Sequence, residues 1–319
     1  MEIFRADNIH KSYANHKALD GVSINVKQGT IYGLLGPNGA GKTSLIRIIN
    51  QITAPDKGEL FFKNRKLKAN DIYNIGYLPE ERGLYKKMKV GEQAVYLAQL
   101  KGLSKSEAIK KLKYWFDKFE IINWWNRKVE ELSKGMQQKI QFIVTILHEP
   151  ELLIFDEPFS GFDPINTNIL KTEIINLKNK GTTIIFSTHN MESVEELCDD
   201  ITLINKSKNI LSGNINDIKQ SYKSNIYNFK FANGFDHLNA SLNHQYKILK
   251  HAKNKYSETL KIKVLDKNLE TNNLVKHLMQ FGTLLQFNET LPTMNDIFIK
   301  LVEQTNKTQT TDNKEPNKN

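Results

Sequence analysis

The apolar positions of residues 2–32 alternate or cluster in short groups, which is the pattern of β-strands with a buried face. An apolar run that begins at Ile31 passes through a glycine-rich segment and is followed by Leu45, Ile48 and Ile49. Spacings of three and four residues place these last side chains on one face of a helix. The order strand, glycine-rich loop and helix is therefore predicted for this stretch.

Residues 90–122 change to a helical period. A capping box, Ser104-x-x-Glu107, precedes one apolar stripe, and Ser133 precedes a second. The stripes comprise Ala108, Leu112, Trp115, Phe116 and Phe119, and then Met136, Ile140, Ile143, Val144 and Leu147. Because each stripe shares one helix face, we interpret the aromatic side chains as core rather than as a ligand-binding group. Residues 88–145 are thus predicted to form a helical subdomain inserted into an α/β core.

An uninterrupted apolar run at 152–155 is typical of a strand buried on both faces of a parallel sheet, and 183–187, with Ile184, Ile185 and Phe186 at its centre, is predicted to be the next buried strand. They belong to a first domain that we predict over residues 1–218. From 222 to 303, alternating strands and a striped helix predict a second, small α+β domain. Residues 304–319 lack the apolar side chains that build a core and are expected to be disordered.

The chain of 319 residues is 39% hydrophobic and 25% charged, as in a globular protein of about two domains. No segment approaches the ~18–20 apolar residues of a membrane span, and the N-terminus has no signal-peptide core, so we expect a cytoplasmic location. The single cysteine, Cys198, excludes an intrachain disulfide and argues against a cysteine-based zinc site. The net charge of +10 is compatible with nucleic acid or an anionic membrane as partner. The lysines are scattered, however, and we interpret them as a solvated basic surface.

The glycine-rich segment fits the phosphate-binding pattern G-x-x-x-x-G-K-[ST]. Its residues are Gly36, Pro37, Asn38, Gly39, Ala40, Gly41, Lys42 and Thr43. The glycines let the backbone bend around an anion, so that several N–H groups point inward. Lys42 then supplies positive charge for the β- and γ-phosphates, and the Thr43 hydroxyl is placed for Mg²⁺. The helix that follows directs its positive dipole end at the same phosphates.

Asp156 and Glu157 directly follow the buried run 152–155. Open α/β sheets bind ligands at the carboxyl ends of their strands, and adjacent carboxylates there repel unless a cation or ordered water is near. Asp156 therefore fits an oxygen partner of Mg²⁺, and Glu157 fits a base that polarises an attacking water. His189 lies just beyond the next buried run and can reach a γ-phosphate from the same sheet edge.

Three other positions keep two interpretations when each is taken alone. Tyr13 could stack on a nucleotide base or pack within its loop. Glu80, just after a strand closed by Pro79, could touch a metal or a partner, or lie in a plain surface loop. Ser133 could be a helix N-cap without a ligand, or it could present free N–H groups to an anion.

Together, these motifs resemble the ATP-binding subunit of an ABC transporter, of the ABC-2 type exporters with a C-terminal accessory domain. The motifs span about residues 3–215, and Leu291–Gln304 resembles chain endings of this group. The resemblance implies an α/β P-loop NTPase of the ABC ATPase type. Its parts would be a mixed sheet core, a helical subdomain and a small C-terminal α+β domain.

The resemblance also implies roles for individual residues. Tyr13 is the adenine-stacking aromatic, Gly36 to Ser44 the Walker A segment, Ile154–Glu157 the Walker B end, Ser160–Asp163 the D-loop, and His189 the switch histidine. Glu157, His189 and Lys42 are then the catalytic residues for bound ATP. Thr43, Asp156 and Glu80 would hold Mg²⁺, and Asp163 would line the nucleotide site.

Leu132–Met136 stands where the family has its LSGGQ signature. In the family, two such domains pair head to tail, and the signature helix of one completes the ATP site of the other. Ser133 and Gly135 would therefore contact the γ-phosphate across a dimer interface. The other implied partner is an integral membrane permease, which would hold the protein at the cytoplasmic face of the membrane. No nucleic acid partner is expected.

The sequence departs from the family pattern at three positions. Lys134 and Met136 replace Gly and Gln of the signature, and Glu80 replaces the glutamine that senses Mg²⁺ and the membrane partner. Glutamate offers an oxygen ligand but adds negative charge beside Asp156 and Glu157.

Two alternative functions remain. One is a soluble ABC ATPase acting on ribosomes or DNA, but such relatives usually carry two nucleotide domains or long insertions, and this chain has one phosphate loop. The other is a regulatory module that holds ATP without useful turnover, which the residues at positions 80 and 136 motivate.

Overall fold

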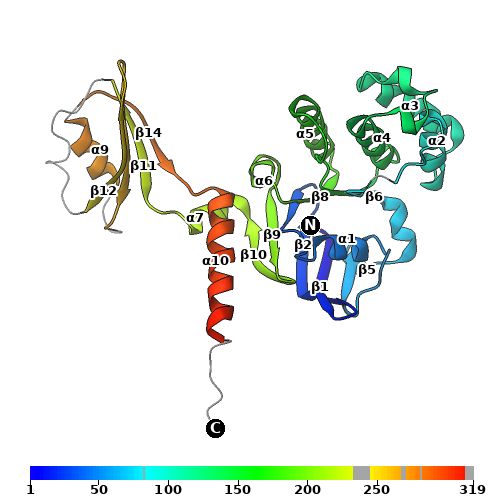
Figure 1. Cartoon of the computed structure of the whole chain (residues 1–319), viewed down its shortest axis with the longest axis horizontal. Coiled ribbons are helices and arrows are strands. Elements are labelled where there is room, and N and C mark those ends of the chain that lie inside the picture. Colours follow the sequence, from blue (N-terminus) through cyan, green and yellow to red (C-terminus); the bar gives the residue numbers. More distant parts are fainter. Residues whose placement is uncertain (82, 233–244, 267–270, 281, 313–319) are drawn as a thin grey trace, which may run out of the picture. The chain divides into compact units, whose positions relative to one another are not determined.

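The computed structural model describes residues 1–81, 83–232, 245–266, 271–280 and 282–312. They form two compact units, Met1–Ile215 and Asn216–Asn319, drawn in Figure 1. Each unit buries its own apolar side chains, so each is described by itself.

The first unit contains two sheets. The antiparallel sheet has the order β2-β1-β4-β5 and consists of β1 (Glu2–Tyr13), β2 (His16–Lys27), β4 (Lys57–Phe62) and β5 (Arg65–Lys66). The six-stranded sheet has the order β10-β9-β3-β8-β7-β6. Its strands are β3 (Ile31–Leu35), β6 (Ile75–Leu78), β7 (Leu152–Asp156), β8 (Thr183–Thr188), β9 (Asp200–Asn205) and β10 (Lys208–Asn214).

Neighbouring strands of the six-stranded sheet are parallel, except that β10 runs antiparallel to β9. Every residue of β3, β7 and β8 is buried, which confirms the buried strands predicted at 152–155 and 183–187. Parallel strands end at the same edge, so the loops that follow β3, β7 and β8 are brought together there.

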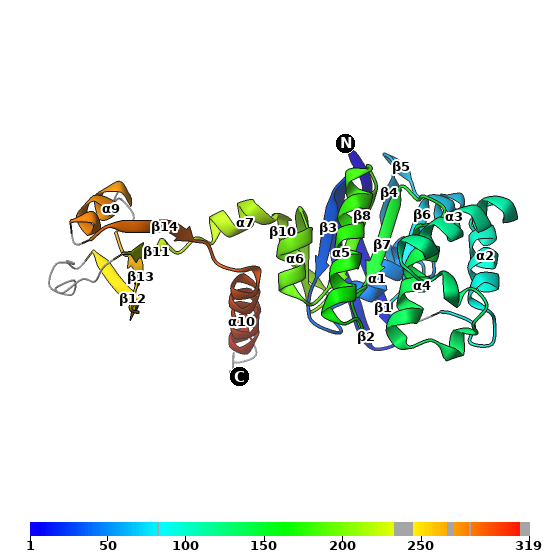
Figure 2. The ribbon, with the colours of Figure 1, turned by 90° about the horizontal axis from the view of Figure 1, so that it is seen from above.

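Different layers cover the two faces of this sheet, as Figure 2 shows. On one face, α1 (Lys42–Ile49) and the antiparallel sheet share an apolar core with alternate residues of β3, β7 and β8. On the other face lie α5 (Pro164–Asn179), α6 (Met191–Leu197) and a helical block. This mixed α/β architecture confirms the predicted fold class.

The helical block consists of α2 (Val90–Leu100), α3 (Lys105–Lys118) and α4 (Lys134–Ile146). Short 3-10 helices lie before and within it, at Ala69–Asn74, Ile122–Trp124 and Val129–Glu131. The capping box is confirmed: the Ser104 hydroxyl accepts from Glu107 N at 3.3 Å, and Ser104 N donates to the Glu107 carboxylate at 3.0 Å. The predicted apolar stripes of α3 and α4 are packed in the core, where Phe116 is fully buried. Phe142 of α4, which was not part of the predicted stripe, is fully buried as well.

Phe142 of α4 joins the helical block to the parallel sheet. Its ring centroid lies 6.1 Å from that of Phe119, after α3, and 5.5 Å from that of Phe155 in β7. Tilted aromatic contacts at these distances add stabilisation to the burial of the rings themselves. The position of α4, and of Ser133 at its N-terminus, therefore depends on this aromatic chain.

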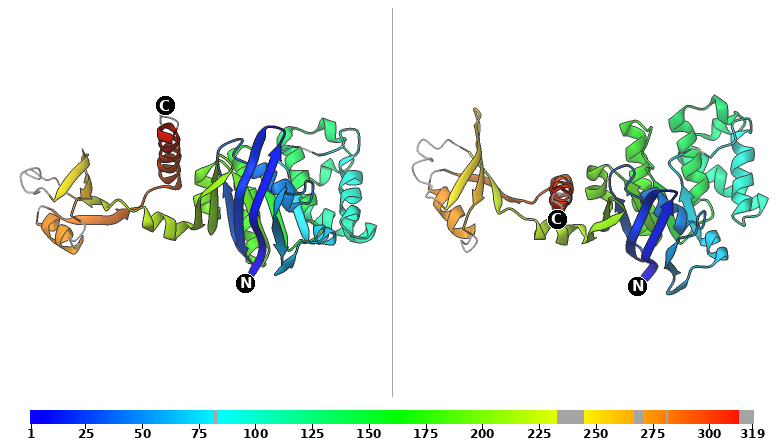
Figure 3. Two further views of the ribbon diagram at one scale, coloured as in Figure 1. Left: turned by 90° about the horizontal axis from the view of Figure 1, so that it is seen from below. Right: turned by 60° about the horizontal axis from the view of Figure 1, so that its bottom comes forward.

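The second unit is built on a four-stranded antiparallel sheet of order β12-β13-β11-β14, seen in two further views in Figure 3. Its elements are α7 (Ile215–Ser221), β11 (Ile226–Phe231), β12 (Tyr246–Lys253), β13 (Glu258–Val264), α9 (Thr271–Met279), β14 (Leu284–Thr290) and α10 (Met294–Asp312). One face packs against Leu274 and Leu278 of α9.

The structure differs from the prediction of a disordered tail from residue 304. Helix α10 continues to Asp312, and 313–319 lie outside the described residues. A local cap starts the helix, because Asp296 N donates to the Thr293 hydroxyl at 3.1 Å and Thr293 N to the Asp296 carboxylate at 3.0 Å. Once a first turn has formed, each further residue adds one hydrogen bond, so polar residues can extend it.

We expect Phe142→Ala to destabilise the first unit by about 3–5 kcal/mol, since it removes a buried ring and leaves a cavity. Urea unfolding followed by tryptophan fluorescence measures the change. Tyr114→Ala removes a ring that is 58% exposed and serves as the control, with a change of about 0.5 kcal/mol or less. Equal losses in the two variants would contradict the role assigned to Phe142.

Candidate functional site

The loop between β3 and α1 has a backbone that glycine alone can adopt. Gly36 has φ 148° and Gly41 has φ 114°, both in the region that L side chains rarely adopt. A Cβ atom at Gly36 would lie 2.2 Å from the Ile204 carbonyl oxygen, and one at Gly41 would lie 2.3 Å from that of Ala18. The loop is thus pressed against β9 and β2, and its path is determined by these contacts.

Lys42 is the first residue of α1 and is only 6% exposed. Its ammonium donates to the carbonyl oxygens of Gly36 at 2.7 Å and Pro37 at 3.1 Å, which holds it over the loop. Burial lowers the pKa of Lys42, and the negative charges of Glu157, Asp156 and Glu80 oppose that shift. The ammonium therefore faces three carboxylates.

The N-terminus of α1 has no side-chain cap, because Gly41 is its N-cap residue. The first N–H groups of a helix have no partner within the helix, and in α1 they belong to the turn that begins with Lys42 itself. This combination of unpaired N–H groups, a helix dipole and a cation suits a phosphate.

Asp156, the last residue of β7, is 1% exposed. Burial raises the pKa of its carboxyl group, and the atom Oδ2 has no hydrogen-bond partner. A buried, unpaired carboxylate oxygen suits a hard cation such as Mg²⁺. In the described part of the chain, no three acidic, histidine or cysteine side chains form a complete metal cluster. A cation here would therefore need further oxygen ligands, such as the Thr43 hydroxyl, phosphate oxygens and water.

Glu157 is held in a strained conformation by the end of β8. Its φ is 47°, uncommon for a residue other than glycine. The Thr188 hydroxyl donates to Oε2 at 3.0 Å and His189 N to Oε1 at 3.0 Å, while His189 Nδ1 lies 2.6 Å from Oε1. The carboxylate is therefore oriented by two adjacent residues. His189 was predicted from the sequence, whereas Thr188, its neighbour in the chain, was not.

A cleft of about 340 Å³ collects most of the predicted nucleotide-binding residues. Its lining comprises Tyr13, His16, Ala18, Asn38, Gly39, Gly41, Lys42, Thr43, Ser44, Glu80, Asp156 and Glu157. Tyr13 is 41% exposed, so its ring is accessible to a ligand. His16 was not predicted, because only the hairpin between β1 and β2 brings it beside the loop. Pro37 and Gly36 contribute carbonyl groups that bind Lys42 rather than cleft surface.

A second cavity, of about 530 Å³, shares Glu80 and Glu157 with this cleft. His189 lines it together with residues of the loop after β7, among them Ser160 and Phe162. The carboxylate that could act as a base therefore separates two hollows.

Ser133, Gly135 and Asp163 are not part of the cleft within one chain. Ser133 is the exposed N-cap of α4, and its hydroxyl accepts from Met136 N at 3.3 Å. A Cβ atom at Gly135 would lie 3.6 Å from the Gly161 carbonyl oxygen, so the start of α4 lies beside the loop after β7. Asp163 caps α5 by accepting from Asn166 N at 2.9 Å. These residues are thus surface groups at two helix N-termini.

The loop, the buried lysine and the carboxylates at the ends of parallel strands define a P-loop nucleotide-binding domain. Comparison with protein families agrees with this class. A model described as "ABC transporter" matches residues 19–160, one described as an AAA domain matches 126–195, and one described as "ATP-binding protein DrrA1-3-like, C-terminal domain" matches 213–302.

Similar proteins point to the same family. The chain is 50% identical to an uncharacterised ABC transporter ATP-binding protein, YhaQ of Bacillus subtilis, over 69% of this chain and 74% of YhaQ. It is 33% identical to the lantibiotic transport ATP-binding protein SrtF of Streptococcus pyogenes, over 66% of this chain and 90% of SrtF. It is 35% identical to the bacitracin transport ATP-binding protein BcrA of Bacillus licheniformis, over 65% of this chain and 68% of BcrA.

Two solved structures share the fold. An ATP-binding subunit of an ABC transporter has a TM-score of 0.64 and 28% identity, covering 69% of this chain and 93% of its own. The ADP conformation of MJ1267, an ATP-binding cassette of an ABC transporter, has a TM-score of 0.60 and 25% identity, covering 68% and 92%. The chain belongs to the ATP-binding proteins of ABC transporters, whose ATPase domains hydrolyse ATP. This confirms the resemblance inferred from the sequence.

We expect Gly36→Ala to weaken ATP binding by about 10-fold or more, because the added Cβ displaces the loop from β9. Isothermal titration calorimetry with ATP measures the affinity. The control is Gly29→Ala, which has a φ of 70° but no atom within 4 Å of the added Cβ. Both variants carry backbone strain, so only the clash at Gly36 should reduce binding. Similar affinities in the two variants would refute this account of the loop.

Proposed function

We propose that two copies of this chain bind and hydrolyse MgATP between them and so drive export of a substrate through a separate membrane permease. The observation that carries the proposal is the convergence of Lys42, Asp156 and Glu157 on one cleft beside an uncapped helix N-terminus. Described residues include no helix long and apolar enough to cross a membrane, so the proposal needs a second protein for that role.

The residues of the cleft divide the work of phosphoryl transfer. Lys42 and the N–H groups of the loop hold the phosphates and stabilise the charge that develops on them. Tyr13 offers its ring face for stacking on adenine. Glu157 accepts a hydrogen bond from the attacking water and orients it, while Thr188 and His189 hold this carboxylate in place. When bound, Mg²⁺ neutralises charge on the phosphates, and Asp156 and Thr43 are the residues best placed to hold it.

The exposed N-terminus of α4 supports the head-to-tail dimer. Ser133 and Gly135 lie outside the cleft of their own chain, and the N–H groups behind Ser133 form an anion-binding helix end. In the proposed dimer, this end meets the γ-phosphate held by the other copy, so each nucleotide is enclosed by both chains. Asp163, at the start of the neighbouring helix α5, would lie at the same interface.

Glu80 distinguishes this cleft from the usual family pattern. Its carboxylate lines both cavities and adds to the negative potential around Asp156 and Lys42. We propose that it contributes an oxygen ligand to Mg²⁺, directly or through water, where the family uses an amide oxygen.

The proposal that this protein drives export rests on its similarity to known transport proteins. The names of SrtF and BcrA state transport of a lantibiotic and of bacitracin, and a DrrA1-3-like C-terminal domain model matches the second unit. By this likeness the protein works at the cytoplasmic face of the membrane, bound to its permease. The identity of the cargo would be decided by that permease.

We expect Glu157→Gln to bind ATP but to hydrolyse it about 100-fold more slowly or worse, because the amide cannot accept the proton of the attacking water. A steady-state phosphate-release assay measures hydrolysis, and gel filtration with ATP shows whether a dimer accumulates. The control, Glu149→Gln, changes an exposed carboxylate and should leave turnover unchanged. Undiminished turnover in the first variant would exclude Glu157 as the base.

A mixing experiment tests the shared site. Lys42→Ala and Ser133→Arg should each be inactive alone, but their heterodimer contains one site in which both halves are intact. We expect phosphate release by the mixture to exceed the sum of the separate variants. Mixing Lys42→Ala with Glu157→Gln is the control, because both changes damage the same half and no intact site can form. Equal results from the two mixtures would contradict the head-to-tail arrangement.

A further inference from the structure

The sheet of the second unit has one covered and one open face. Tyr227, Phe229 and Phe231 of β11 point to the side of α9 and share its apolar core. Side chains alternate along a strand, so Ile226, Asn228 and Lys230 point to the opposite side. The apolar core of this unit lies on the α9 side of the sheet, and no described helix adds a core residue on the open side.

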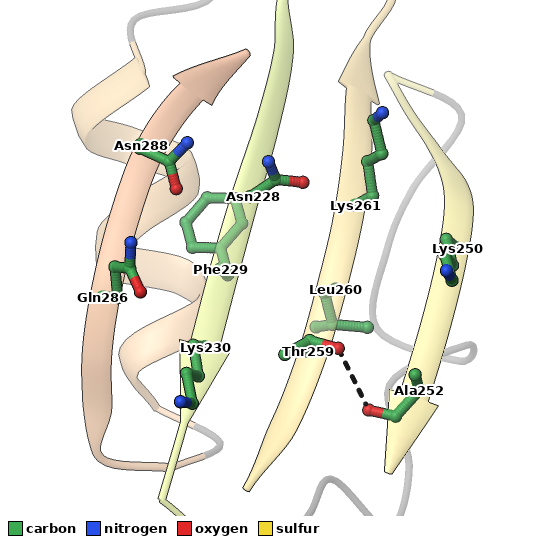
Figure 4. A pocket seen from close by; sticks show the side chains of 10 residues that line it. All are labelled: Asn228, Phe229, Lys230, Lys250, Ala252, Thr259, Leu260, Lys261, Gln286 and Asn288. Carbon is green, nitrogen blue, oxygen red and sulfur yellow. Dashed lines mark hydrogen bonds between the residues drawn. The ribbon is translucent and has the colours of Figure 1, made fainter. Parts of the chain in front are cut away.

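Strand pairing assigns twelve residues to the open face in three rows. The rows are Lys247, Lys263, Ile226 and Thr290; Lys250, Lys261, Asn228 and Asn288; and Ala252, Thr259, Lys230 and Gln286. Figure 4 shows eight of these side chains, from all four strands. Five of the twelve are lysine and none is acidic.

A hollow of about 580 Å³ lies over this face. It is lined by Lys230, Lys250 and Lys261, with the amides of Asn228, Gln286 and Asn288 between them. Ammonium and amide N–H groups are hydrogen-bond donors, so the hollow presents mainly donors to whatever enters it. A ligand rich in anionic oxygen atoms fits this lining.

The lysines repel one another. Lys250 lies opposite Lys261, and Lys247 opposite Lys263, on adjacent strands. Like charges directly opposite on a sheet are destabilising. Within the described residues, none of these four lysines makes an ion pair. The pKa of Asp296 is lowered mainly by its hydrogen bonds with Thr293, and the charge of Lys261 contributes a smaller part of that shift. An anionic ligand would remove the repulsion.

The hairpin of β12 and β13 strengthens this charge. Between residues 247 and 263 there are six lysines and one acidic residue, Glu258. Glu258 is 1% exposed and pairs with His251, so it does not neutralise the open face. Two apolar side chains stay exposed beside these lysines: Leu249 at 42% and Tyr256, in the hairpin turn, at 79%.

We propose that this open face binds the phosphate headgroups of an anionic lipid membrane. The five lysines of the open face attract several phosphates at once, and the exposed Tyr256 and Leu249 suit the boundary between headgroups and acyl chains. Single-stranded nucleic acid is the less suitable partner, since the twelve positions offer no aromatic ring on which a base could stack. This contact needs neither ATP nor a permease, and so it is separate from the proposed ATPase function.

Flotation of the full-length protein with vesicles tests the proposal. Binding should be weak to phosphatidylcholine, should rise when phosphatidylglycerol is added, and should fall as salt increases. The variant Lys230→Gln/Lys250→Gln/Lys261→Gln should lower the partition coefficient on the order of 100-fold, at roughly five-fold for each lysine near the surface. Its melting temperature should not fall, because the changes remove repulsion.

A charge-matched control separates this face from net charge. Lys105→Gln/Lys110→Gln/Lys113→Gln removes three exposed lysines of α3 and should bind vesicles as the parent does. Equal loss in both triple variants would overturn the proposal in favour of general charge. Equal binding to vesicles with and without phosphatidylglycerol would overturn it too. So would a preference for single-stranded RNA over vesicles that the sheet variant abolishes.

Discussion

The buried ammonium of Lys42 is the interaction on which the first unit depends. A lysine that is 6% exposed is costly unless its donors are satisfied and its charge is balanced. The carbonyl groups of the glycine-rich loop satisfy the donors, and the carboxylates at the ends of neighbouring strands balance the charge. Loop, helix and parallel sheet thus place groups of both signs at one edge, where phosphates and a cation can be bound together.

In the proposed dimer, this edge of one chain supplies only part of each nucleotide site. Thr188 and His189 orient Glu157, and Asp156 keeps an oxygen without a hydrogen-bond partner, so the cleft suits a cation and a water. Ser133, the other group suited to a phosphate, lies at the end of a helix positioned by the aromatic chain around Phe142. Ser133 does not line the cleft of its own chain, and in the proposed dimer a second copy supplies this contact.

The residues and elements that were not predicted from the sequence carry no local motif or apolar pattern of their own. His16 and Thr188 have no motif of their own, and the hairpin and the end of β8 bring them to the site. Strand β12 was not singled out from the sequence, because its exposed lysines interrupt the apolar alternation that marks the neighbouring strands. The turns of α10 after residue 304 carry no apolar stripe, yet backbone hydrogen bonds continue from a capped first turn.

The sequence by itself determined the phosphate loop, the buried strands and the two carboxylates at the end of β7, because glycine freedom, apolar periodicity and strand-end chemistry are local properties. It thereby indicated the fold class and the ATPase family. Only the tertiary structure decided that Lys42 faces three carboxylates, that Glu157 is oriented from β8, and that Ser133 lies apart. It also decided that scattered lysines gather on one sheet face, since strand pairing joins positions far apart in the chain.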